Sequence, residues 1–167
     1  MTENVHPTRR RFLALTGAGA TTALVGCTGS SGSGSSPGYR NGEVDVPSDA
    51  TPRNAEETAA AQAAAGTQAN QNVSAMDDLE IADHAFAYED GYTGSTVQGV
   101  IENTGNDRMD TVEVRVRVYN SDDQQLGRYV ASTGDLGGGS SWSFQVILLE
   151  SPADIASYDV AVLGLPA

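Results

Sequence analysis

Cys27 is the reactive side chain with the most informative surroundings, because it is the chain's single cysteine. A lone cysteine cannot form an internal disulfide, so its thiol stays available for another reaction. Leu24-Val25-Gly26 precede it, and a Thr/Gly/Ser-rich tract follows it. Small residues before a cysteine allow a peptidase to cut there, and the new N-terminal cysteine can then carry a lipid. We therefore expect Cys27 to be lipidated.

Other side chains that could support chemistry are few. His84 is the single histidine beyond the first 26 residues, and the usual zinc ligands are missing around it in the sequence. Acidic pairs occur at Asp77-Asp78, Glu89-Asp90 and Asp122-Asp123. Paired carboxylates could serve glycoside hydrolysis or hold Ca²⁺, but turn formation and solvated charge explain them equally well. We predict no catalytic residue, no metal site and no cofactor.

Residues 1–26 are expected to be an export signal. Arg9-Arg10, followed by Phe12-Leu13, opens an apolar run of 15 residues that ends at Gly26. That run is shorter than the roughly 20 residues needed to span a bilayer. The pattern resembles a twin-arginine signal joined to a lipoprotein processing site. The resemblance implies attachment to the extracellular face of the cytoplasmic membrane through a lipid on Cys27.

The charge of the chain restricts its partners. All nine basic residues are arginine, and six of them remain beyond residue 26 against 21 acidic residues. A lysine-free, acidic composition resembles haloarchaeal proteins, because at about 1 M salt the Debye length of roughly 3 Å screens the self-repulsion. Proteins that bind nucleic acids neutralise phosphates with clustered basic residues, so we predict no nucleic-acid partner.

Residues 27–76 are expected to form the lipidated cysteine and a flexible Ser/Gly/Ala-rich tether, mostly disordered. The segment lacks a periodic apolar pattern, and its Ser/Gly tract is typical of a flexible linker. A short helix over 55–65 is the one element that its alanines favour. Asn72-Val73-Ser74 is a glycosylation sequon, which makes Asn72 a candidate modification site.

Residues 77–167 predict an all-β domain. Six β-rich runs are separated by Gly/Asn/Asp clusters, and Gly127 is expected to mark a bulge in the fourth run. Six or seven antiparallel strands in about 90 residues are typical of an immunoglobulin-like sandwich. The runs cover residues 79–88, 95–102, 111–120, 126–132, 141–149 and 157–163.

One stretch of this domain resembles a known family. Gly99-Val100-Ile101-Glu102-Asn103-Thr104-Gly105, followed by the alternating run that ends in Val118-Tyr119-Asn120, is similar to the FxLYD domain. The resemblance covers roughly residues 79–163. It implies an immunoglobulin-like sandwich in a secreted or lipid-anchored protein, and it supplies no catalytic residue.

The third run alternates strictly, with valines on one side and charged residues on the other. Its outward stripe contains Arg115, Arg117 and Tyr119, which could form a contact face for an acidic or carbohydrate partner, or could pair with neighbouring carboxylates. We therefore expect a non-enzymatic interaction module whose partner is an unknown cell-envelope protein or glycan. The alternatives are a ligand-binding accessory lipoprotein of a transporter and, third, a hydrolase.

Replacing the proposed lipid acceptor tests the anchor directly. Cys27→Ser should release the protein into the medium, because the domain would lose the acyl chains that hold it in the bilayer. Fractionation of cells and medium, with detection of the protein in each, measures the release. Retention of the variant in membranes after high-salt and carbonate washing would contradict lipid anchoring.

Overall fold

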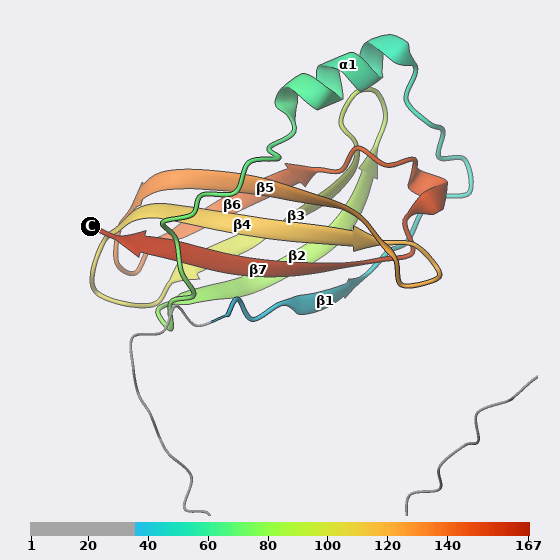
Figure 1. Ribbon diagram of the computed structural model, residues 1–167. Helices are drawn as coiled ribbons and strands as arrows, with labels where there is room; N and C mark the ends of the chain where they lie inside the picture. The colour runs from blue at the N-terminus through green and yellow to red at the C-terminus, as the bar shows by residue number, and fades with distance from the viewer. Residues whose placement is uncertain (1–35) are drawn as a thin grey trace, which may run out of the picture. The chain divides into compact units, whose positions relative to one another are not determined.

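The computed structural model describes residues 36–167, which form two antiparallel β-sheets (Figure 1). One sheet has the strand order β1-β7-β4-β5, and the other has the order β2-β3-β6. The predicted immunoglobulin-like sandwich is confirmed, with seven strands. The strands are β1 (Arg40–Glu43), β2 (Leu79–Glu89), β3 (Gly94–Asn103), β4 (Met109–Tyr119), β5 (Gln125–Leu136), β6 (Ser141–Ile147) and β7 (Ser157–Pro166).

Two helices complete the described chain. These are α1 (Ala55–Ala64) and the short 3-10 helix η1 (Pro152–Asp154). Within residues 36–167, neither is long and apolar enough to cross a membrane. Cys27 lies outside the described residues, and so do the export-signal residues Arg9, Arg10, Phe12 and Leu13. Their roles therefore stay predictions.

Strict alternation in β4 builds the centre of the core. Val112, Val114, Val116 and Val118 are completely buried, because alternate side chains of a strand point to the same face. The three-stranded sheet packs its own apolar side chains against them, and these include Val97, Ile101, Phe144 and Val146. The inward-facing apolar side chains of the two sheets thus form the core that the alternating runs predicted.

The predicted irregularity at Gly127 is present. In the β4–β5 pair, Val118 lies opposite Gly127 while Tyr119 lies opposite Gln125. Leu126 is therefore the extra residue of a bulge, and its side chain is among the few large apolar ones left exposed. The bulge sits next to the β4–β5 turn, at one end of the sandwich.

The structure departs from the expected tether over residues 40–76. Strand β1 pairs along its whole length with β7, from Arg40 opposite Val160 to Glu43 opposite Ser157. It thus fills the edge position that a C-terminal strand occupies in an immunoglobulin sheet. Hydropathy did not reveal this strand because backbone pairing, rather than burial of large apolar side chains, holds it in place.

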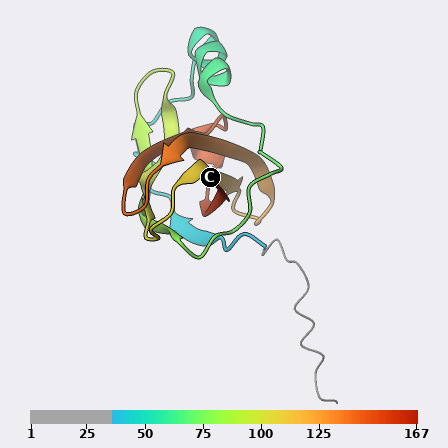
Figure 2. The same ribbon diagram turned by 90° about the vertical axis from the view of Figure 1, so that its left-hand side faces the viewer.

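Helix α1 covers nearly the whole range predicted from its alanines, and it begins with a capping box. The Asn54 side chain accepts hydrogen bonds from the backbone N–H groups of Glu56 and Glu57, and the Glu57 carboxylate accepts one from the Asn54 N–H. These contacts satisfy donors that a helix start otherwise leaves unpaired. Ala61 alone among its residues is fully buried. Figure 2 shows α1 standing at one edge of the two sheets.

Residues 65–76, which we call the strap, return from α1 across the outer face of the four-stranded sheet (Figure 1). The strap bridges to the edge of β5 at Gly66, opposite Val130, and to the edge of β7 at Ser74, opposite Gly164. Val73, on the strap, is buried as well. The segment expected to be a linker is therefore part of the folded domain.

A buried carboxylate fixes the middle of the strap. Glu113 is only 2% exposed on the outer face of β4. Its Oε1 accepts from Arg115 Nε at 2.7 Å, and its Oε2 accepts from the Asn70 N–H at 2.8 Å. Arg115 also donates through Nη2 to the Asn70 carbonyl at 2.7 Å. Each charge is thus paired, and both backbone groups of Asn70 are used.

We predict that Glu113→Ala destabilises the domain by about 3 kcal/mol, since it leaves Arg115 and the Asn70 N–H without their shared partner. Chemical denaturation of the full chain measures the free energy of unfolding. Glu102→Ala, at an exposed position of β3, is the matched control and should change it little. Equal losses in the two variants would show that the buried ion pair does not hold the strap.

Candidate functional site

The predicted contact face lies on the outer side of β4, but its charges are used within the chain. Arg117 donates to Asp159 on β7 through Nε at 2.8 Å and also through Nη2, which makes a two-pronged ion pair. Tyr119 donates its hydroxyl to the same carboxylate at 3.1 Å. The ring of Tyr39 stacks on the Arg117 guanidinium at 3.6 Å. The hydrogen bond with Asp159 raises the pKa of Arg117 further, so its charge is permanent.

Both arginines of the stripe are thus engaged within the chain, and a role of the stripe as a contact face stays a prediction. Arg115 is tied to Glu113 and the strap, and Arg117 is covered by Tyr39, which precedes β1. The side chains of the two arginines are 15% and 30% exposed. Cross-strand pairing with carboxylates, the alternative left open by the sequence, describes this surface. Asn72, by contrast, is exposed on the strap and stays a candidate for glycosylation.

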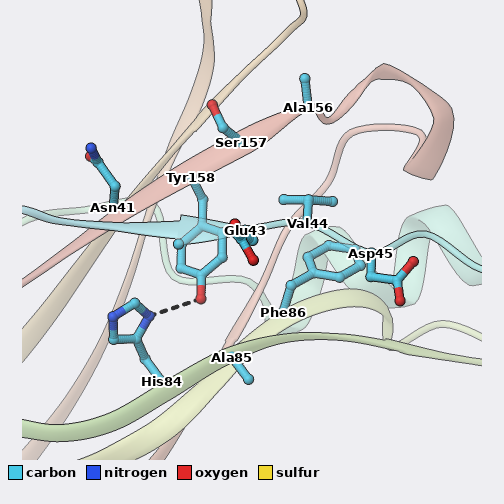
Figure 3. A pocket seen from close by; sticks show the side chains of 11 residues that line it. Asn41, Glu43, Val44, Asp45, His84, Ala85, Phe86, Ala156, Ser157 and Tyr158 are labelled. Carbon is cyan, nitrogen blue, oxygen red and sulfur yellow. Dashed lines mark hydrogen bonds between the residues drawn. The ribbon is translucent and has the colours of Figure 1, made fainter.

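A cleft of about 900 Å³ lies where the sandwich opens between β1 and β2 (Figure 3). Strand β1 belongs to the four-stranded sheet and β2 to the three-stranded sheet, and each is an edge strand. The start of β7 forms the back of the cleft. Residues far apart in the sequence, from positions 41 to 158, therefore meet in one concave surface.

A histidine–tyrosine pair joins the two sheets inside the cleft. His84 of β2 and Tyr158 of β7 share a hydrogen bond of 2.8 Å between Nδ1 and Oη, and their rings meet edge to face (Figure 3). Burial lowers the pKa of His84, although Asp83 opposes the shift, and Arg40 adds to it. Burial also raises the pKa of Tyr158 to about 12. Both side chains are therefore neutral near pH 7.

Carboxylates and an aromatic ring complete the lining. Glu43 and Asp45 are exposed at the rim, on and just after β1, while Phe86 of β2 and Val44 are half-buried. Figure 3 shows the Phe86 ring next to Val44 and Asp45. Among the residues that line the cleft, none is basic. The cleft thus combines a neutral, partly aromatic floor with an acidic rim.

A second, smaller hollow lies over the start of β7, next to the β4–β5 turn. Its volume is about 290 Å³, and Tyr119, Asp123 and Asp159 contribute to its lining. Asn41, Ser157 and Tyr158 line both hollows. Asp123 has a positive φ of 58°, which Asp tolerates in a turn better than most residues do. Of the residues of β1, Asn41 lines this second hollow.

Sequence reasoning placed His84 at the edge of the core, where the structure has it, but missed the cleft. The cleft was missed because β1 was not predicted, although the residues of β1 alternate in exposure. Exposed Asn41, Glu43 and Asp45 alternate with half-buried Gly42 and Val44. Glycine at position 42 is also needed for space, since a Cβ atom there would lie 2.0 Å from the Tyr158 ring.

Comparison with known proteins gives relatives without an assigned activity. No family model matches the chain, so the resemblance to the FxLYD family is not confirmed. The uncharacterized protein MJ0360 of Methanocaldococcus jannaschii is 30% identical over 86 residues, which cover 50% of this chain and 63% of that protein. The chain thus spans less than two thirds of this archaeal relative.

A solved structure gives a more distant likeness. A DUF1425 family member from Shewanella sp. pv-4 has a TM-score of 0.39 and 10% sequence identity, over 58% of this chain and 94% of that one. Neither relative's name states a ligand or a reaction.

The depressed pKa of His84 predicts a specific pH dependence. As the pH falls through about 6.5, an unfolded chain takes up a proton on this residue before the folded chain does, so stability falls until the pH reaches the lower folded pKa. Thermal melting of the wild type should therefore drop more between pH 7 and pH 5 than melting of His84→Gln. The carboxylates titrate in both proteins and cancel. Identical pH profiles would contradict the burial of neutral His84.

Proposed function

We propose that this protein is a non-enzymatic interaction module, held at the cell surface by a lipid on Cys27, that binds another component of the envelope. The observation that supports this role is the open cleft beside β1, which is an edge strand. Concave surfaces with a few convergent polar groups are the usual places for binding.

The cleft lies next to the proposed anchor in the sequence. Strand β1 begins at Arg40, thirteen positions after Cys27. A fully extended chain of that length spans at most about 45 Å. An anchored domain would consequently present β1 and the cleft within a short distance of the membrane surface, where other envelope components are found.

The second candidate is an accessory lipoprotein that binds a small ligand for a transporter. The concavity of the cleft and its neutral His84–Tyr158 pair favour it. Against it, the cleft opens along one side of a single sandwich and leaves a bound molecule largely exposed, whereas small-molecule sites bury most of their ligand. Binding to an extended macromolecular segment suits such an open shape better.

Crosslinking in cells tests the interaction role. A photoreactive side chain at position 45, on the rim of the cleft, should capture an envelope component at high salt, and the same group at position 107, in the β3–β4 connection, should not. Mass spectrometry of the adducts identifies the partner. If neither position yields an adduct while the purified protein hydrolyses a glycan, the module is wrong and an enzyme takes its place.

A further inference from the structure

We propose that the cleft binds an extended segment of another envelope protein, carrying arginine or lysine, which adds as a strand to the free edge of β1. The inference rests on the proposed function and defines the chemistry of the partner. It depends on three features of the described residues. The outer edge of β1 is unpaired, the cleft lies beside this edge, and carboxylates stand at the rim of the cleft.

The outer edge of β1 has no strand partner in the described residues. The edge of β7 is paired with β1 and Ser74, and one position on the edge of β5 is bridged by Gly66. The other sheet ends in β2 and β6, which have one strand neighbour each. The edge of β1 borders the cleft, which residues 41–45 line together with residues of β2.

The cleft beside the free edge of β1 suits an added strand. Successive side chains of an extended segment point to opposite faces, so alternate residues of a segment beside β1 would face the cleft. In this type of recognition, main-chain hydrogen bonds provide affinity and pockets for alternate side chains provide specificity.

The lining selects a basic side chain. Phe86 and Val44 offer an apolar floor for an aliphatic stem, and Glu43 and Asp45 lie at the rim where its charged head would reach water. The domain already binds one of its own arginines in this manner, with a carboxylate on its edge and a tyrosine on its face.

The test titrates the purified full chain, in molar NaCl, with the fluorescent peptide Ser-Thr-Val-Arg-Arg-Val-Thr-Ser. We expect saturable binding that the double variant Glu43→Gln/Asp45→Asn weakens about tenfold, because its rim no longer attracts the cation. Asp107→Asn/Asp110→Asn, which neutralises two exposed carboxylates of the β3–β4 region, is the matched control and should bind as the wild type does. Unchanged affinity in the cleft variant would overturn the proposal.

Two altered probes separate strand addition from simple charge attraction. The peptide with alternate amides N-methylated keeps its charges but cannot pair with β1, and we expect it to lose binding. Equal binding of the methylated peptide would overturn strand addition. Binding of argininamide alone, as tight as that of the peptide, would instead identify a small organic cation as the ligand and would also overturn it.

The cellular experiment distinguishes failure of this inference from failure of the proposed function. An envelope partner captured at position 45 in the wild type and equally in Glu43→Gln would leave the interaction module standing and overturn the basic segment. Absence of any captured partner, at either position, would overturn the proposed function itself. Capture that Glu43→Gln reduces, together with the peptide results, supports both.

Discussion

The architecture depends on a carboxylate that is buried on the outer face of the four-stranded sheet. Glu113 points away from the main core, and burial of an ionised group is costly unless donors surround it. Arg115 and the Asn70 N–H supply those donors, so the strap must cross the sheet at this point. Once the strap is fixed, Gly66 and Ser74 cover the edges of β5 and β7. This one buried ion pair therefore makes the strap part of the folded domain.

The sandwich itself could be predicted because each core strand carries its own signal. The four valines of β4 alternate with charged residues, and Trp142, Phe144 and Val146 alternate in β6. Turn-forming residues separate these runs, so strand limits agreed with the structure to within a few residues, except at the end of β5. Local patterns of this kind depend only on whether a face meets the core or the solvent.

The strap, β1 and the cleft were not predictable in the same way. Their stability comes from backbone pairing and from partners 40 or more positions away, such as Asn70 with Glu113 and Tyr39 with Arg117. A polar, alanine-rich segment has the composition of a linker whether or not a sheet edge is available to it. The arginine stripe resembled a binding face for the same reason. The residues that cover it, Tyr39 and the strap, lie far from β4 in the sequence.

Strand β1 also has a mechanical consequence. In a lipid-anchored chain, a force between the membrane and the folded core enters the domain just before β1, where Tyr39 stacks on Arg117. Beyond that contact, four residue pairs with β7 carry the load, and a pull across the strand would peel them one at a time, starting opposite Val160. Strand β1 would therefore detach before the valine core unfolds.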